Sequence, residues 1–302
     1  MPYDLTDPRT QLVAAVPRPT GGACRAAQYA ELGAQPPSDV SELGTTTWWV
    51  RGQRCVLGYS QAVRGECFGR VGHPDEHVVL LPGDASSATV EANGRSVSVQ
   101  GAALIVVPPG DSRITVETDG VIVRIFSAEA AGLTARCAND GAYAEPDPNV
   151  APYRPWPEPI AGYDVRVYRM ADVPTEPGRF GRIFRCTTLM VNVLPLDAGP
   201  RDPDKLSPHF HDDFEQISLQ LDGDYVHHMR TPWTPKLADW RDDEHAACAG
   251  PAIVVIPPPL VHTSQAVGDM RHWLVDVFAP PRLDFSQRPG WVLNAGDYPM
   301  PG

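Results

Sequence analysis

The 302-residue sequence lacks several features that mark common functional classes. It has 25 lysine and arginine residues against 37 aspartate and glutamate residues, a formal net charge of −12, and no run of basic residues. An acidic chain of this kind is a poor partner for nucleic acid or for an anionic membrane surface. Its longest apolar runs, ALIVVP and AIVVIP, have the length of a β-strand and are too short to cross a bilayer.

Cysteine is sparse and scattered as well. The six cysteines form no CxxC pair, and the N-terminal MPYDLTDPRT has neither the charged nor the apolar region of a secretion signal. These absences predict a reduced, cytoplasmic protein. The sequence also has no GxSxG, no phosphate loop of the GxxxxGK type and no GxGxxG after a strand, which argues against α/β-hydrolase and nucleotide-binding folds.

What the chain does contain is many short strand-like runs. Its 33 prolines and 26 glycines are dispersed, and 42% of the residues are hydrophobic. From Thr45 onward, β-branched runs recur roughly every eight to twelve residues with turn residues between them, which is typical of an all-β sandwich or barrel. The one helix that the pattern predicts is short and lies in the segment CRAAQYAELGA, residues 24–34.

The most informative motif is HFHDDFE, which contains His209, His211 and Glu215, followed later by His262 in IPPPLVH. On an extended strand the even spacing of HxHxxxE places all three side chains on one face. On a helix the two histidines would point about 200° apart. Three imidazoles and a carboxylate suit a divalent transition metal, so His209, His211, Glu215 and His262 are predicted to bind one.

These residues resemble the two motifs of the cupin superfamily. The first motif, HxHxxxE followed after seven residues by Gly223, matches well. The second begins at Gly250 and reaches His262, but Pro259 stands where glycine is common and no asparagine follows four residues after His262. The resemblance implies a jelly-roll barrel, also called a double-stranded β-helix, with a metal at its mouth and open coordination positions.

A second, damaged copy of the motif precedes the first. GAALIVVPPG from Gly101 matches GPAIVVIPPP from Gly250 at an offset of 149, and Glu76 matches Glu215 at an offset of 139. The repeat predicts two tandem cupin-type units, a bicupin. The predicted divisions are an N-terminal arm at 1–45, a degenerate unit at 46–137, a proline-rich linker at 138–162 and a metal-binding unit with a tail at 163–302.

The same offsets indicate that the first unit has lost its metal ligands. They place Arg70, Gly72 and Arg113 where the second unit has histidines, and only Glu76 remains. Two arginines beside one carboxylate would pair with it and exclude a cation. The first unit is therefore structural or an anion pocket built on Arg70 and Arg113. His73 and His77 lie nearby, off the required parity if Glu76 faces inward.

Candidates for substrate contact follow from the strand DYVHHMR and the loop after it. Tyr225 and His227 share one strand face and Arg230 lies on the other, and parity alone does not say which face lines the barrel. Tyr225, His227 and Glu215 are predicted catalytic residues, Arg230 a clamp for a carboxylate. The loop at 231–249 is long enough for a lid, and its Trp240 is a second predicted substrate contact.

Three functions fit these residues. The leading one is an iron-type dioxygenase that acts on a small aromatic or carboxylate-bearing substrate. The second is a non-redox metal-dependent lyase or isomerase for a small acid or sugar. The third is a metal-containing binding protein without catalysis, and the fold alone does not decide among them.

The predicted cofactor is one divalent transition metal per chain, iron first, with manganese, nickel, zinc and copper as alternatives. The predicted partner is a small-molecule substrate, with no nucleic acid and no membrane. A homodimer is also predicted, in which the first 45 residues serve as an exchanged arm.

Overall fold

The computed structural model describes residues 23–173, 175–176, 179–234 and 236–302, and this part of the chain is almost entirely β-structure. Its one α-helix is α1 (Leu283–Ser286). Residues 1–22 of the predicted arm lie outside the described residues. Short 3-10 helices occur at η2 (Leu32–Ala34), η3 (Thr134–Arg136), η4 (Asp140–Tyr143), η5 (Met170–Asp172), η6 (Pro203–Lys205) and η7 (Leu237–Asp239).

The N-terminal barrel combines a seven-stranded and a four-stranded antiparallel sheet. The larger sheet runs β12 (Arg166–Arg169), β9 (Ala103–Val107), β6 (His77–Leu81), β11 (Gly120–Ser127), β4 (Cys55–Ala62), β3 (Thr46–Arg51) and β2 (Asp39–Val40). The smaller sheet runs β5 (Cys67–His73), β10 (Gly110–Val116), β7 (Ser87–Ala92) and β8 (Arg95–Gln100).

The C-terminal barrel has the same construction. Its larger sheet runs β1 (Gln28–Glu31), β19 (Ala252–Ile256), β16 (Gln216–Asp222), β21 (Arg271–Phe278), β14 (Met190–Val193) and β13 (Arg182–Arg185), with β15 (Asp197–Ala198) added to β21. Its smaller sheet runs β18 (Glu244–Ala249), β17 (Asp224–Arg230) and β20 (Val261–Val267). The predicted fold class, two tandem jelly-roll barrels in an all-β chain, is confirmed.

Two strands cross the boundaries that the sequence predicted. β1 comes from the predicted arm yet pairs with β19 of the C-terminal barrel, and β12 follows the predicted linker yet pairs with β9 of the N-terminal barrel. The helix predicted for residues 24–34 is wrong, because Gln28–Glu31 is this added strand. A sheet edge that offers free backbone groups overrides a local helical preference.

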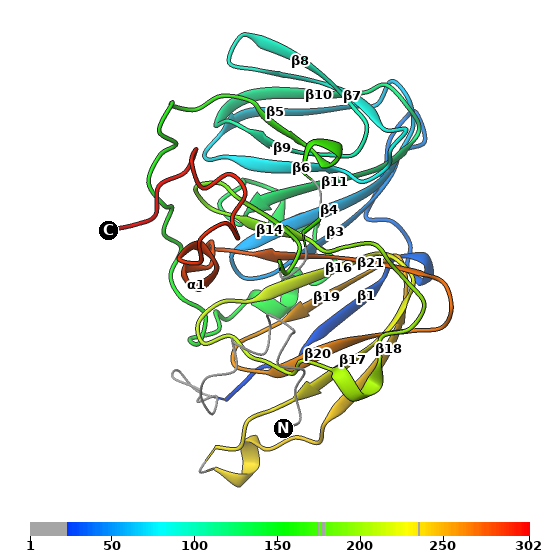
Figure 1. Ribbon diagram of the computed structural model, residues 1–302, viewed down its shortest axis with the longest axis vertical. Helices are drawn as coiled ribbons and strands as arrows, with labels where there is room; N and C mark the ends of the chain where they lie inside the picture. Colours follow the sequence, from blue (N-terminus) through cyan, green and yellow to red (C-terminus); the bar gives the residue numbers. More distant parts are fainter. Residues whose placement is uncertain (1–22, 174, 177–178, 235) are drawn as a thin grey trace.

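The main core lies between the barrels. The two larger sheets occupy the middle of the molecule and the two smaller sheets its ends (Figure 1). One continuous cluster joins Leu57, Leu80 and Ile125 of the first barrel to Ile217 and Val277 of the second. β9 and β19 are buried at every residue, because one face lines their own barrel and the other meets the opposite sheet. This double burial explains the repeated apolar runs.

Gly223 joins β16 to β17 and has no room for a side chain. Its φ is +86°, and a Cβ atom there would lie 2.4 Å from the carbonyl oxygen of Arg271. Gly223→Ala is expected to destabilise the fold by roughly 2–4 kcal/mol, since both backbone strain and a backbone clash act at this position. Denaturant unfolding measures the loss. Gly268→Ala is the control, because Gly268 has a similar φ of +81° but nothing within 4 Å. An equal loss in both variants would refute the clash.

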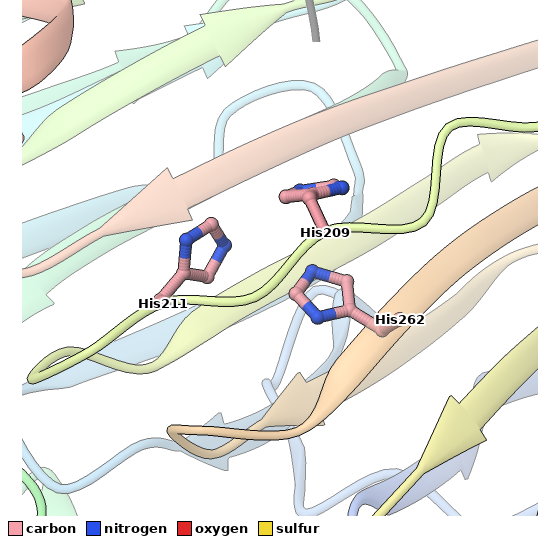
Figure 2. A group of neighbouring side chains, drawn as sticks. All are labelled: His209, His211 and His262. Carbon is pink, nitrogen blue, oxygen red and sulfur yellow. The ribbon is translucent and has the colours of Figure 1, made fainter. Parts of the chain in front are cut away.

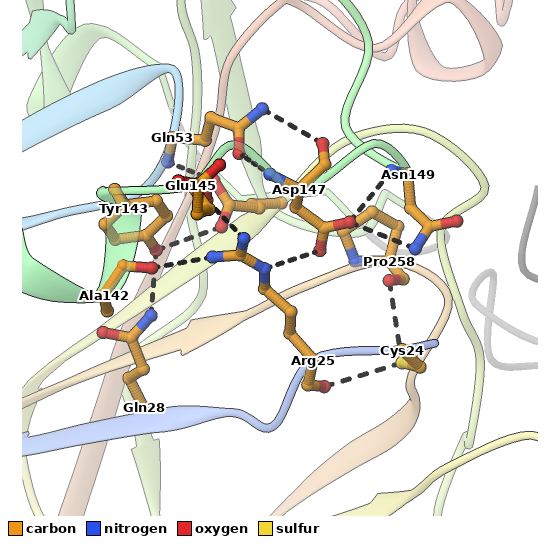
Figure 3. A network of polar contacts seen from close by, with 11 residues as sticks. Cys24, Arg25, Gln28, Gln53, Ala142, Tyr143, Glu145, Asp147, Asn149 and Pro258 are labelled. Carbon is orange, nitrogen blue, oxygen red and sulfur yellow. Dashed lines mark hydrogen bonds and ion pairs between the residues drawn. The ribbon is translucent and has the colours of Figure 1, made fainter. Parts of the chain in front are cut away.

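The proline-rich linker contacts both barrels through its aromatic side chains. The hydroxyl of Tyr143 donates to Glu215 at 3.0 Å, that of Tyr153 donates to Asp75 at 2.6 Å, and Trp156 lies under the guanidinium of Arg185. Figure 3 shows that the linker also contacts the segment around β1. Arg25 donates to the carbonyl of Ala142 and pairs with Asp147, and Gln28 donates to the hydroxyl of Tyr143. The linker is therefore an ordered part of the interface between the barrels.

Candidate metal centre

Three buried histidines converge at one end of the C-terminal barrel. One ring nitrogen from each of His209, His211 and His262 lies within 4.8 Å of the others, and the three side chains point toward one another (Figure 2). Their exposed fractions are 8%, 4% and 2%. This is the only group of three or more metal-ligating side chains within the described ranges, so three of the four predicted ligands come together.

The backbone explains why these rings meet. His209 lies opposite His262 in an isolated antiparallel bridge. The backbone nitrogen of His209 is 3.0 Å from the carbonyl oxygen of His262, and the reverse nitrogen-to-oxygen distance is 2.7 Å. Cross-strand partners bring their Cβ atoms close together. The extended segment from His209 to His211 then places the second histidine on the same side, as the HxH spacing predicted.

The hydrogen bonds of the rings suit a metal ion. Nδ1 of His209 lies 3.0 Å from the carbonyl of Ser207, and Nδ1 of His262 lies 2.9 Å from that of Leu260. A carbonyl only accepts, so each Nδ1 donates and each Nε2 keeps its lone pair. Nε2 of His262 and Nδ1 of His211 are buried without any hydrogen-bond partner among the residues described. Burial also lowers the pKa of His262 to about 4, which keeps this ligand neutral.

Glu215 does not join this group, which corrects its prediction as a ligand and base. Its Oε1 accepts from Tyr143, and its Oε2 accepts from the backbone N–H of Gln53 in the other barrel. The cause is a bend at Asp212 and Asp213, after which β16 begins only at residue 216. The bend breaks the alternation of faces on which the HxHxxxE argument depended.

The glutamate that recurs at positions 76 and 215 therefore has a role other than metal binding. Glu76 accepts from the backbone N–H of Thr187 at 2.9 Å and from the hydroxyl of Tyr298 at 2.8 Å. Glu215 has the matching pair of partners, one backbone N–H and one tyrosine hydroxyl. Each glutamate thus binds a loop between two strands of the opposite barrel. The repeated carboxylate stabilises the contact between barrels and leaves the metal centre to other residues.

Burial raises the pKa of Glu215 to about 7, although its two hydrogen bonds oppose the shift. The pKa of Glu215 is higher in the folded state than in the unfolded state. The stability that protonated Glu215 contributes to the fold is therefore fully present below about pH 4.5 and is lost as the pH rises through 7. Relative to Glu215→Gln, the wild type is expected to lose on the order of 3 kcal/mol of unfolding free energy between pH 4.5 and 8. Urea unfolding of both proteins across this range measures it, and parallel pH profiles would contradict it.

Gln216 occupies the place next to the histidines that Glu215 was predicted to fill. Its Oε1 lies 2.9 Å from Nε2 of His211. Its Nε2 donates to Ser218 at 2.8 Å and to the carboxylate of Asp276 at 3.1 Å, which fixes the orientation of the amide. The sequence signal for it was the alternating run QISLQL, whose polar positions face the barrel interior. The group beside the metal centre is therefore a neutral carboxamide.

The N-terminal unit needs a similar correction of one residue. A bulge in β10 between Gly110 and Ser112 places Ser112 opposite Arg70, so Ser112 is buried and Arg113 is exposed. Arg113 therefore lines no pocket with Arg70. His77 follows the outward-facing Glu76 and is fully buried in the barrel interior.

The two inward-facing candidates on β17 are placed differently. His227 is fully buried next to the metal centre on the same wall, with ring nitrogens 2.9 Å from Ser264 Oγ and 2.6 Å from Gln220 Nε2. Burial lowers its pKa to about 3, so it is a neutral hydrogen-bonding residue. Tyr225 lines a separate cavity of 470 Å³ with His272, to which none of the three metal-centre histidines contributes.

The two predicted substrate contacts lie on the outer surface. Arg230 is exposed and forms a bidentate salt bridge with Asp243, in which the shortest nitrogen-to-oxygen distance is 2.6 Å. Trp240 stacks on Trp233 at a centroid distance of 4.5 Å. Arg230 shares a shallow cavity of 310 Å³ with His262, whereas Trp240 lies in the neighbouring one. Of the two, Arg230 therefore lies at a cavity that one of the three histidines also lines, whereas none of the three lines the cavity of Trp240.

A cavity of 960 Å³ opens beside His211, and sequence reasoning missed it. Its inner wall carries Arg282, whose guanidinium stacks on Phe285 at 3.7 Å and pairs with Asp284. The charge of Arg282 adds to burial in lowering the pKa of His211. The cavity is built by the linker and the tail after β21, neither of which has a recognisable motif. Its aromatic lining includes Trp156, Phe210 and Phe214.

No family profile matches the sequence, and no curated protein matches it. Solved structures do match. An oxalate decarboxylase of Lactobacillus farciminis in complex with formate has 15% identity and a TM-score of 0.57, and the match covers 88% of this chain and 90% of that one. The oxalate decarboxylase of Bacillus subtilis has 12% identity and a TM-score of 0.55, with 89% and 82% covered. The chain has the bicupin fold.

An IolB-like protein of Salmonella typhimurium resembles this chain as well, at 14% identity and a TM-score of 0.51, with 80% of this chain and 91% of that one covered. At these identities the similarity concerns the fold. No helix in the described part of this bicupin is long and apolar enough to cross a membrane.

Proposed function

We propose that this bicupin is a metal-dependent enzyme that acts on a small carboxylate-bearing substrate at His209, His211 and His262. The observation that carries the proposal is the charge of the ligand set. All three ligands are neutral imidazoles, and the adjacent side chain, Gln216, is a neutral amide. A bound divalent cation would keep its full double charge toward the substrate side, which favours an anionic ligand.

The surroundings of the histidines support the same substrate class. Arg282 places a guanidinium in the wall of the cavity beside His211, where its charge acts on that ring although it also pairs with Asp284. The acidic residues Asp212, Asp213 and Asp284 line the same cavity but are exposed, so solvent screens them. The metal would supply a Lewis acid, and the protein residues would orient the carboxylate and exclude water from it.

For the reaction, a lyase that breaks a bond next to the carboxylate is the first candidate. Its support is the likeness of the fold to two oxalate decarboxylases over most of both chains, combined with a site that attracts carboxylates. His227 would then be a neutral hydrogen-bond partner in the barrel interior, because its pKa lies far below the range of a general base at neutral pH.

An iron-type dioxygenase is the second candidate. Three imidazole ligands leave positions for both a substrate and O₂, and the aromatic lining from Trp156, Phe210 and Phe214 suits a flat substrate. The candidate metals are therefore iron, manganese, nickel, zinc and copper.

One assay separates these candidates. Protein reconstituted with iron or with manganese is mixed with small mono- and dicarboxylates and with catechol-like acids, while CO₂ release and O₂ consumption are recorded together. CO₂ release without stoichiometric O₂ consumption supports the lyase, and stoichiometric O₂ consumption supports the dioxygenase. Absence of both with every metal would leave a metal-containing binding protein. A homodimer and a cytoplasmic location are further predictions, the first of which sedimentation analysis tests.

A further inference from the structure

The interior of the N-terminal barrel contains a second cluster of polar side chains, at the position that corresponds to the metal centre. Arg70 lies opposite Ser112 across β5 and β10, as His209 lies opposite His262 in the other barrel. His77 directly follows Glu76, just as Gln216 follows Glu215. Ser112 has an exposed fraction of 7% and His77 of 0%, while Arg70 is half-buried and leads to the surface.

Most polar atoms of this cluster have no partner. Nε of Arg70, Oγ of Ser112 and both ring nitrogens of His77 are buried without a hydrogen bond to any described residue. Buried polar atoms are nearly always satisfied, so several together point to a ligand. His73 also lies here, with Nε2 at 3.4 Å from Oδ1 of Asp75. Both ring nitrogens of His73 and this oxygen lack a hydrogen bond to any described residue, while Oδ2 of Asp75 accepts from Tyr153.

The cluster is positively charged and has no carboxylate that neutralises its arginines. Among the described side chains neither Arg70 nor the buried Arg124 forms a salt bridge, and Arg124 is held between Phe68 and Trp49, with its guanidinium carbon 3.7 and 4.8 Å from the ring centres. Arg70 donates to the carbonyl of Ala131 and Arg124 donates to Ser60, but neither acceptor carries a charge. A guanidinium does not lose its proton readily, so one without a salt-bridge partner in a barrel interior is costly.

Two of the groups with unpartnered atoms, His77 and Arg70, lie beside one aromatic ring, and Ser112 is the cross-strand neighbour of Arg70. His77 stacks on Phe126 at a centroid distance of 4.9 Å, and the guanidinium carbon of Arg70 lies 5.7 Å from the same ring. We propose that the N-terminal barrel binds a small carboxylate anion, which accepts hydrogen bonds from Arg70, Ser112 and His77. A hydroxyl, an imidazole N–H and a guanidinium are all donors that the two oxygens of a carboxylate can accept from.

A metal ion does not fit this cluster. Arg70 and Arg124 repel cations, and both contribute to lowering the pKa of His77 after burial. The described residues contain no third ligating group that converges with His73 and His77. The anion site is independent of the proposed function, because it involves no residue of the metal centre.

The test measures anion binding to protein whose metal has been removed with a chelator, so that the C-terminal barrel holds no cation. Sodium acetate and sodium formate are titrated by calorimetry at constant ionic strength, with sodium chloride as the comparison. The wild type is expected to bind a carboxylate saturably. Arg70→Gln is expected to weaken binding at least tenfold, and Ser112→Ala severalfold. Arg113→Gln is the matched control, since it makes the same change at the residue that follows Ser112 in sequence, and Arg113 is exposed on the outer face.

Several outcomes would overturn the proposal. Unsaturable heats, or equal heats with chloride, mean an adventitious ion only. Unchanged affinity in Arg70→Gln means that the carboxylate binds elsewhere. Saturable zinc binding that His77→Ala abolishes and Arg70→Gln leaves intact means a second metal site. Circular dichroism checks the fold of each variant, and if Arg70→Gln is unfolded, unchanged affinity in Ser112→Ala refutes the site.

Discussion

His211→Ala is expected to remove the bound metal from the protein. Wild-type protein purified without affinity-tag metals should contain close to one divalent ion per chain, and the variant should contain less than about a tenth of that. The reason is that a buried site with three imidazole ligands loses a third of its donors, and no described carboxylate lies near enough to replace one. Elemental analysis of both proteins measures the effect.

The control for this prediction is Glu215→Gln. The spacing HxHxxxE predicts that this change also removes the metal, whereas the structure predicts that it does not, because Glu215 binds Gln53 and Tyr143 of the interface. A metal-free Glu215→Gln variant with an intact fold would restore Glu215 as a ligand. A wild type that binds no metal even after anaerobic reconstitution would refute the metal centre itself.

Gln216→Glu is expected to strengthen metal binding and to weaken carboxylate binding at least tenfold. A carboxylate in place of the amide would neutralise half of the charge that attracts the substrate. Two unit charges about 4 Å apart interact by about 4 kcal/mol at an effective dielectric constant near 20, so a tenfold loss is a conservative expectation. Competition between a chelator and the protein measures metal affinity, and titration with a carboxylate substrate measures the second effect.

The change at Gln216 also faces Asp276, which now accepts a hydrogen bond from the amide. The double variant Gln216→Glu, Asp276→Asn removes the resulting repulsion and is the matched control. If the double variant binds carboxylates as well as the wild type, the loss in the single variant comes from Asp276 rather than from the charge at the metal.

Strand content, the two-barrel fold and the convergence of three histidines could be predicted from the sequence because they depend on local patterns. Alternation within β-strands and the apolar runs of β9 and β19 are local, and Asn93–Gly94 makes the turn from β7 to β8 with positive φ at both residues. His209 and His211 both precede the bend at Asp212 and Asp213, so their side chains still lie on the same side of the chain, as the HxH spacing predicts.

The errors at Glu215 and Arg113 share one cause, a shift of a single residue in strand register. The bend after His211 moved the inward position from Glu215 to Gln216, and the bulge in β10 moved it from Arg113 to Ser112. Bends and bulges of this kind reverse every subsequent side chain between the two faces. Short-range patterns do not report them, so sequence reasoning assigned the wrong neighbour in both units.

The cavity beside His211 and the pairing of β1 with β19 were missed for a different reason. Both depend on segments that are distant in sequence, and neither the tail nor the first strand has a motif of its own. Contacts of this kind are decided by the completed fold.

The exchange of β1 and β12 between the barrels has a consequence for folding. Gln28 pairs with Val255, so the first described strand cannot complete its sheet until nearly the whole chain has been synthesised. Neither half of the chain contains all of its own barrel, and separation would expose the apolar faces of both large sheets. The two barrels should therefore unfold in one cooperative transition and fold slowly for their size. The same interdependence means that the N-terminal barrel would be needed for folding even without a ligand of its own, because the C-terminal barrel requires it as a folding partner.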